Sequence, residues 1–132
     1  MILSFQERFI EKIVNKTKIH TIRSDSKGRW KKDMTIHFWK GNPRNVKQDP
    51  YQFASGIVES VHTIFINPFL SSVEIWHKEE MIKQIWKENE LNQFAINDGF
   101  NNWNELIEFF PTTFEGKIIT WNSDIEICKQ ID

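Results

Sequence analysis

The chain has 132 residues, of which 39% are hydrophobic and 14% aromatic, and its formal net charge is −1. This length predicts a single domain over residues 1–132, with one core built from large rings. No apolar run approaches the roughly 18 residues that a membrane helix needs, and Glu7 and Arg8 stand where a signal peptide would be apolar. We therefore expect a soluble, cytoplasmic, monomeric protein without a membrane partner.

Cysteine and histidine usage bears on disulfides and metals. Cys128 is the single cysteine, so the chain cannot form an internal disulfide. A zinc site built from cysteines is excluded for the same reason, and the four histidines show no metal-ligand spacing. The sequence therefore predicts no metal and no other cofactor.

The small net charge hides a strong asymmetry along the chain. Residues 1–47 hold 12 Lys and Arg against 4 Asp and Glu, a net charge of +8, whereas residues 48–132 hold 5 against 14, a net charge of −9. Such segregation favours one cationic region able to hold phosphates. The alternative is that the two halves interleave in space and neutralise each other.

The amino-terminal residues have the pattern of a short amphipathic helix. Ser4 and Glu7 match a capping box, in which the hydroxyl and the carboxylate bond each other's free backbone amides. Phe5, Phe9 and Ile13 then recur at helical spacing. These residues predict a helix that ends at about position 14 and packs its apolar stripe in the core.

Residues 18–23 contain enough β-branched side chains to predict a strand. On a strand Thr21 and Arg23 face one way, whereas His20 faces the other. Lys18 lies at the bend before the strand, from which its side chain could reach the Thr21 side.

The rest of the chain changes between strand and helix patterns. Strands are predicted over residues 35–39, 53–66, 71–76, 117–121 and 125–128. Helices are predicted over residues 78–91, up to a helix end or turn at Gly99, and again from Asn102. About six short strands with two or three flanking helices make an α+β domain, and a small mixed β-barrel would remove the free strand edges.

Polar side chains are concentrated in residues 15–23, which hold two lysines, an arginine, two hydroxyls and an imidazole. An anionic or highly polar ligand is the simplest reason for such a density of donors and cations, and a basic surface loop is the alternative. The candidate ligand-binding side chains in this segment are Lys16, Lys18, His20, Thr21 and Arg23.

A second group combines aromatic and basic side chains. Trp30 and Trp39 are flanked by cations, and Arg44 lies in the turn that follows. Base stacking together with phosphate contacts would suit a single-stranded RNA. For each tryptophan, burial in the core is the alternative.

The order of these motifs resembles that of the ASCH domain, a branch of the PUA-like superfamily. The resemblance is carried by residues 3–5, a helix, Lys18-x-x-Thr21-x-Arg23, the strand at 35–38, Asp98-Gly99-Phe100 before a further helix, and the closing segment 116–121. It implies a PUA-like β-barrel with flanking helices. It also implies that the ligand is a nucleoside or RNA.

A departure from the family pattern Gly-x-Lys-x-x-Glu-x-Arg points to an activity. Lys16 stands at the glycine position and Thr21 at the glutamate position. With threonine at this position, the sequence resembles the bacterial N4-acetylcytidine amidohydrolases. This resemblance implies that Lys18 is the proton acceptor and Thr21 the nucleophile. Asp98 would replace the glutamate that donates a proton in those enzymes.

The implied chemistry sets physical requirements. A threonine hydroxyl becomes a nucleophile only when a base takes its proton, and Lys18 can do so only if desolvation or nearby cations lower its pKa. Arg23 could stabilise the oxyanion, and Asp98 would have to carry a proton to the leaving amine. Because Asp is shorter than Glu, and a displacement of roughly 1 Å can cost on the order of a hundredfold in rate, binding without catalysis stays open.

Three other interpretations remain open. Lys18, Thr21 and Asp98 could be a solvated lysine, an ordinary strand residue and a turn residue. The protein could be a non-catalytic RNA-binding module that uses the basic residues 27–44, or a ribonuclease with His20 as acid or base. The hydrolase requires the first three side chains to share one concave pocket.

Overall fold

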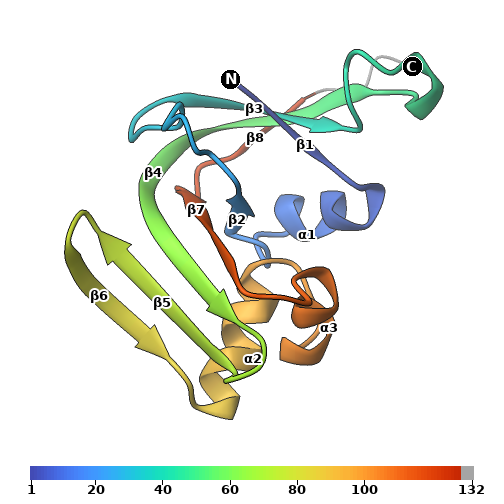
Figure 1. The fold of residues 1–132 in the computed structure, drawn as a ribbon. Helices are drawn as coiled ribbons and strands as arrows, with labels where there is room; N and C mark the ends of the chain where they lie inside the picture. Colours follow the sequence, from blue (N-terminus) through green and yellow to red (C-terminus); the bar gives the residue numbers. More distant parts are fainter. Residues whose placement is uncertain (129–132) are drawn as a thin grey trace.

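The computed structural model describes residues 1–128. These residues form an α+β fold with a mixed eight-stranded sheet and three helices, which confirms the predicted class (Figure 1). The strands are β1 (Ile2–Phe5), β2 (His20–Arg23), β3 (Thr35–Lys40), β4 (Tyr51–Asn67), β5 (Ser72–His77), β6 (Glu80–Ile85), β7 (Phe114–Trp121) and β8 (Glu126–Ile127). The helices are α1 (Ile10–Val14), α2 (Glu88–Asn97) and α3 (Trp103–Phe109), with short 3₁₀ segments η1 (Glu7–Phe9) and η2 (Val46–Gln48). No helix within residues 1–128 is long and apolar enough to cross a membrane.

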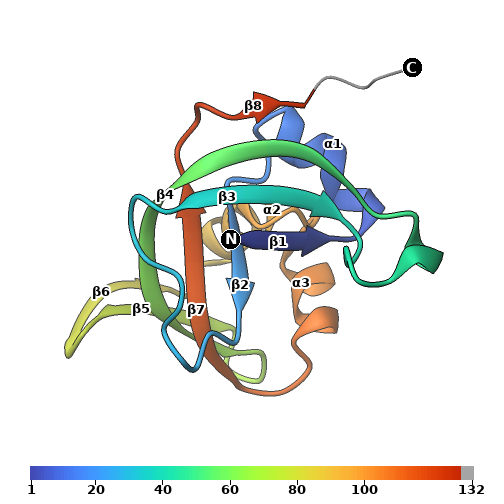
Figure 2. The same cartoon turned by 90° about the horizontal axis from the view of Figure 1, so that it is seen from above.

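The sheet is organised by β4, a long strand that bends so that its two halves join different neighbours (Figure 2). The first half of β4 pairs with β3 and β8, and the second half pairs with β5 and β7. Three further strands lie at edges of the sheet: β1 pairs with β3, β2 with β7 and β6 with β5. Only β1 and β3 run parallel among these pairs, so the sheet is mixed.

The predicted small barrel is wrong, because the sheet within residues 1–128 has eight strands rather than about six and is not closed. The edge strands β1 and β2 do not pair with each other in this part of the chain. Instead of a strand ladder, the guanidinium of Arg23 on β2 donates to the carbonyl oxygen of Ser4 on β1 at 2.7 Å. The pocket that carries the candidate site lies at this gap.

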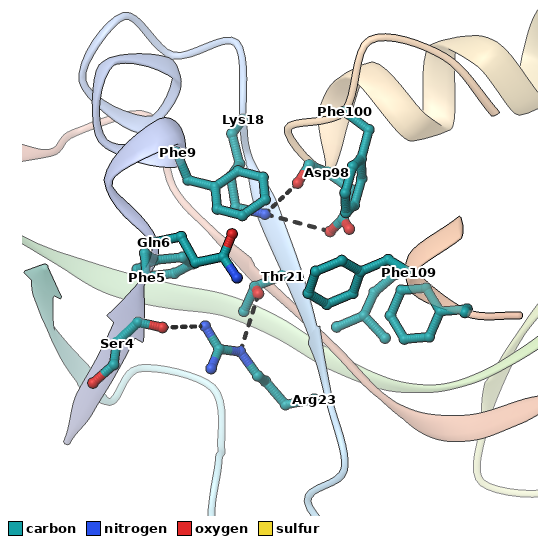
Figure 3. A pocket seen from close by; sticks show the side chains of 12 residues that line it. Ser4, Phe5, Gln6, Phe9, Lys18, Thr21, Arg23, Asp98, Phe100 and Phe109 are labelled. Atoms are coloured by element: carbon teal, nitrogen blue, oxygen red, sulfur yellow. Dashed lines mark hydrogen bonds and ion pairs between the residues drawn. The ribbon is translucent and has the colours of Figure 1, made fainter. Parts of the chain in front are cut away.

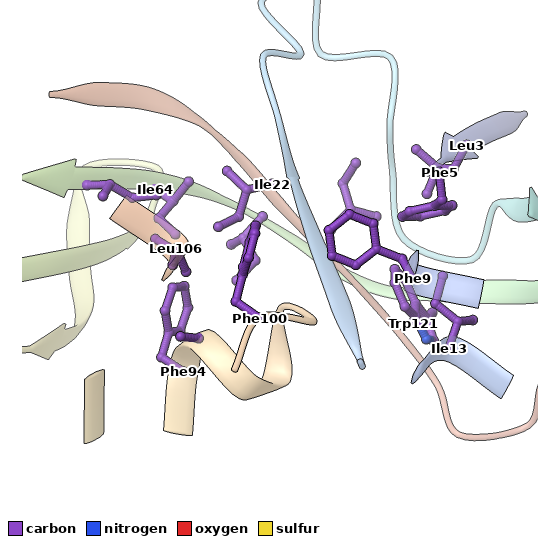
Figure 4. Packing of buried hydrophobic residues seen from close by; sticks show 14 of the residues in the cluster. Leu3, Phe5, Phe9, Ile13, Ile22, Ile64, Phe94, Phe100, Leu106 and Trp121 are labelled. Atoms are coloured by element: carbon purple, nitrogen blue, oxygen red, sulfur yellow. The ribbon is translucent and has the colours of Figure 1, made fainter. Parts of the chain in front are cut away.

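Hydrophobic side chains cover both sides of β2 (Figure 4). His20, Thr21 and Ile22 are all buried as a result, and this explains why apolar and polar residues do not alternate cleanly along the strand. The side chains on the Ile22 side come from β4, α2, α3 and the turn between these two helices, and they include Ile64, Phe94, Phe100 and Leu106. Those on the other side include Leu3, Phe5, Phe9, Ile13 and Trp121.

The predicted ends of the first helix and the predicted start of α3 had different outcomes. The capping box is wrong, because Ser4 lies within β1 opposite Trp39, and the first helical turn begins after Gln6 without a side-chain cap in the described residues. The expected helix nevertheless ends at Val14. At α3 the expected start is confirmed, since the side chain of Asn102 accepts a hydrogen bond from the amide of the third helical residue at 2.9 Å.

The helix predicted over residues 78–91 is also wrong. Residues 80–85 form β6, which pairs with β5 in a hairpin, and α2 begins only at Glu88. Met81 and Ile82, which had suggested an apolar helix face, are 41% and 49% exposed. Their spacing fits a helix, but pairing with β5 satisfies the backbone of this segment as a strand.

Candidate functional site

A pocket opens where β1 and β2 fail to pair, and the segments after α2 and at the end of α3 close its other side (Figure 3). Its volume is about 220 Å³. Four residues singled out from the sequence, Lys18, Thr21, Arg23 and Asp98, line it together. The other lining residues are Ser4, Phe5, Gln6, Phe9, Ile22, Phe100, Phe109 and Phe110.

Lys18 reaches the pocket from the bend before β2, on the side of Thr21, as the sequence had suggested. Its side chain is 3% exposed. The ammonium donates hydrogen bonds to the carbonyl oxygens of His20, at 2.8 Å, and of Asp98, and Nζ lies 3.5 Å from Oδ1 of Asp98. Two backbone carbonyls therefore hold two of the three ammonium hydrogens, and the third is left for another partner.

The surroundings of Lys18 change its acidity. Burial lowers the pKa of the ammonium from the usual 10.5 to about 8; the negative charge of Asp98 opposes this shift, and the positive charge of Arg23 adds to it. With a pKa near 8, roughly one molecule in ten carries a neutral amine at pH 7. The requirement that Lys18 could act as a base near neutral pH is met by its desolvation.

Gly99 makes room for the lysine side chain. Its φ of +101° is a conformation that other residues rarely adopt, and a Cβ atom at this position would lie 2.8 Å from Cδ of Lys18 and 2.8 Å from Cδ1 of Phe9. The turn after α2 can therefore press its backbone against Lys18 only with a glycine there. This close approach brings the neighbouring Asp98 to the pocket.

Asp98 lies at the carboxyl end of α2 and is 4% exposed. Its Oδ1 atom lies 3.0 Å from Nδ1 of His20, whose ring packs on Phe94 of α2 at a centroid distance of 5.1 Å. His20 thus points to the helix side of β2, opposite to Thr21, which confirms the predicted alternation. The carboxylate accepts from His20 and pairs with Lys18, so both partners hold it in position.

Thr21 and Arg23 form the opposite wall. Nε of Arg23 donates to Oγ1 of Thr21 at 3.2 Å, and the guanidinium lies 4.9 Å from the ring centroid of Phe5. Burial lowers the pKa of Arg23, against the attraction of Asp98, but an arginine side chain stays charged. The hydroxyl oxygen is therefore held beside a permanent positive charge.

Phenylalanine rings make most of the remaining wall. Phe9 and Phe100 meet edge to face with centroids 5.6 Å apart, and Phe109 lies 5.6 Å from Phe100. Phe109 is 51% exposed, although it lines the pocket. From the sequence such residues were expected in the core, and their part in the site was missed. The one local signal was Asp98-Gly99-Phe100, which joins a polar group, a turn and a ring.

The other residues predicted to bind a ligand lie elsewhere in the described chain. Lys16 is exposed and lines another hollow with Glu59, which Lys18 also borders. Trp30 is 8% exposed and belongs to the hydrophobic core. Trp39 is half-buried on β3, and Arg44 is exposed before η2. Neither these four residues nor His20, which was also predicted to bind the ligand, is part of the pocket lining.

The pocket combines three groups that acyl-transfer chemistry uses. Lys18 can lose its proton near neutral pH, Thr21 offers a hydroxyl beside the charge of Arg23, and Asp98 offers a carboxylate next to the lysine. Among residues 1–128 no group of three or more His, Cys, Asp or Glu is arranged to hold a metal ion. Comparison with known proteins finds no matching family model, no matching curated protein and no matching solved structure.

Proposed function

We propose that this protein is an amidohydrolase that removes the acyl group from the exocyclic amine of a modified nucleoside such as N4-acetylcytidine. The observation that carries the proposal is the meeting of Lys18, Thr21, Arg23 and Asp98 in one pocket. The order of these residues also underlies the resemblance to the ASCH domain, and we propose a PUA-like relationship in which the sheet is left open beside the site.

The first step forms a tetrahedral adduct on Thr21. The neutral amine of Lys18 takes the proton of the Thr21 hydroxyl, and Oγ1 attacks the acetyl carbonyl carbon. The carbonyl oxygen becomes an oxyanion, which the guanidinium of Arg23 stabilises as its charge develops. Because Arg23 already donates to Oγ1 at 3.2 Å, its charge lies beside the reacting atom before the substrate arrives.

The second step releases the nucleoside and leaves an acyl-threonine. The bond between the carbonyl carbon and the exocyclic nitrogen breaks, and the proton taken by Lys18 passes through Asp98, 3.5 Å away, to the departing amine. Water then attacks the acyl-threonine with Lys18 again as the base. Acetate leaves, and the proton returns to Oγ1 of Thr21.

The walls of the pocket suit one planar base. The volume of about 220 Å³ is below the roughly 300–1,000 Å³ of sites for drug-sized ligands, and Phe9, Phe100 and Phe109 offer ring surfaces. Aromatic rings stack on bases with little dependence on sequence. The polar groups would then distinguish an acylated amine from a plain one.

The direct test is acetate release. The protein is incubated with N4-acetylcytidine, with plain cytidine as the blank. The wild type is expected to release acetate, and the near-isosteric Thr21→Val variant should not, because it lacks the nucleophile. Thr17→Val is the matched control, since Thr17 is exposed and outside the pocket lining. Wild-type release no greater than that of Thr21→Val would overturn the proposal.

A non-catalytic RNA-binding module is the second candidate. It is supported by the loop between β2 and β3, where Lys27, Arg29, Lys31 and Lys32 are all exposed. Affinity for single-stranded RNA should then fall steeply with salt, because bound counterions are released. Affinity that is insensitive to salt would remove this candidate. The ribonuclease gains no support, because the His20 ring is buried against Phe94 and Asp98.

A further inference from the structure

A second hollow adjoins the pocket. It has a volume of about 480 Å³ and lies between the end of β1, the end of β3 and η2. The two hollows share a wall made of Ser4, Phe5 and Gln6. The two hollows are therefore neighbours at the end of β1.

Lys40 gives the second hollow its positive charge. The register of β1 and β3 places Lys40 beside Phe5, and Lys40 follows the buried Phe38 by two residues, so its side chain leaves β3 on the face of Phe5. That face already holds the Arg23 guanidinium, 4.9 Å from the Phe5 ring centroid. Among the residues that the structure describes, Lys40 takes part in no ion pair. Apart from the Tyr51 ring, whose centroid lies 5.9 Å from Nζ, the ammonium is available to an anion.

Uncharged side chains and one carboxylate complete the lining. The side-chain oxygen of Gln48 accepts from the amide of Asn42 at 2.7 Å, which leaves the Gln48 amide nitrogen as a donor. Gln6 is exposed on the shared wall and offers a second amide. Glu7 offers an acceptor. Donors and a cation suit a phosphate, and the acceptor suits a sugar hydroxyl.

We propose that this hollow holds the sugar and phosphate of a nucleotide whose base occupies the Lys18 pocket. The inference rests on the proposed function and names its substrate class, a phosphate-bearing nucleotide in preference to a free nucleoside. Arg23 lies at the junction, because it lines the first hollow and donates to Ser4 of the shared wall at 2.7 Å. Lys40 is then a residue that determines specificity for the phosphate.

The test measures binding by calorimetry, separately from turnover. Cytidine, cytidine 3′- and 5′-monophosphate and a cytidine trinucleotide are compared on the wild type, on Lys40→Gln and on the control Lys83→Gln, an exposed lysine of β6. A charge-assisted contact predicts that one monophosphate binds at least about tenfold more tightly than cytidine. Lys40→Gln should bring that ratio close to one, and Lys83→Gln should keep it.

Each outcome decides the inference. Equal affinities for cytidine and its phosphates, no binding of any of them, or a ratio that survives Lys40→Gln would overturn it. A ratio that favours the monophosphate and is lost in Lys40→Gln supports the inference. If the trinucleotide then binds more tightly than the monophosphate, the substrate is a polymer; if the two bind equally, it is a free nucleotide. The proposed hydrolysis fails separately, since missing acetate release can accompany an intact ratio, and acetate release can accompany a ratio of one.

Discussion

The ammonium nitrogen of Lys18 lies 3.5 Å from Oδ1 of Asp98, although the two residues are 80 positions apart in the chain. Their side chains are only 3% and 5% exposed. Desolvation disfavours the ammonium more than Asp98 favours it, so the pKa of Lys18 falls to about 8 instead of rising. The contact therefore holds a lysine that can lose its proton near neutral pH.

The stability of the protein should rise with pH above about 8. The folded-state pKa of Lys18, about 8, lies below the usual 10.5. Between these pH values the unfolded chain holds a proton that the folded chain has lost, so the free energy of unfolding rises with pH. The gain is on the order of 3 kcal/mol. Urea unfolding of the wild type and of Lys18→Met across this window measures it. The difference between the two proteins should change with pH, and a constant difference would contradict the expectation.

Hydrolysis of the acylated nucleoside should depend on the same proton. Only the neutral amine of Lys18 can accept the proton of Thr21, so kcat/KM should rise about tenfold per pH unit below a pH of about 8 and level off above it. A series of acetate-release assays at different pH values gives the profile. A rate that is flat through this pH, or that falls there, would exclude Lys18 as the base.

Removing the negative charge of Asp98 should destabilise the fold. Asp98→Asn keeps the shape but leaves the Lys18 ammonium buried without its counter-charge, and breaking a buried pair in this way costs roughly 3–5 kcal/mol. Asp124→Asn, at an exposed carboxylate, should stay within about 0.5 kcal/mol. Chemical denaturation measures both.

A double variant checks the cause of that loss. When Lys18→Met is combined with Asp98→Asn, no charge is left uncompensated, so the two losses should sum to more than the loss of the double variant. Strict additivity would mean that the two side chains do not act as a pair.

Gly99→Ala should be far more costly than a similar change in an open turn. A Cβ atom would lie 2.8 Å from both Lys18 and Phe9, at a φ of +101°. Backbone strain and overpacking together should therefore lower the free energy of unfolding by about 3 kcal/mol. Gly28 also has a positive φ, of +61°, but a Cβ atom added there would have nothing within 4 Å. Gly28→Ala should therefore lose only about 1 kcal/mol. Similar losses in the two variants, measured by thermal or urea unfolding, would disprove the close approach.

Trp30 should matter for stability and not for stacking on a base. It is 8% exposed, so Trp30→Ala should lose roughly 3–5 kcal/mol through the cavity it leaves. Trp86 is 62% exposed, and Trp86→Ala should change stability by only about 0.5 kcal/mol. Urea unfolding compares them. If Trp30→Ala kept its stability and lost affinity for RNA, Trp30 would be a binding residue after all.

Local rules predicted the parts of the site that lie close together in the chain. Alternation along a strand placed Thr21 and Arg23 on one side and His20 on the other, and the hydrogen bonds of β2 agree with this. The same kind of rule failed at residues 80–85, because apolar spacing cannot reveal that β5 supplies a pairing partner. The amino-acid sequence of this segment is therefore compatible with both a helix and a hairpin strand.

The sequence by itself determined the α+β class, most strand positions, the cap at Asn102 and the residue types able to carry the chemistry. Only the tertiary structure decided that Asp98 meets Lys18, that phenylalanines line the pocket, and that the sheet stays open between β1 and β2. The physical reason is that propensity, alternation and capping act over a few residues. Burial, desolvation and contacts between distant segments arise only when the whole chain has folded.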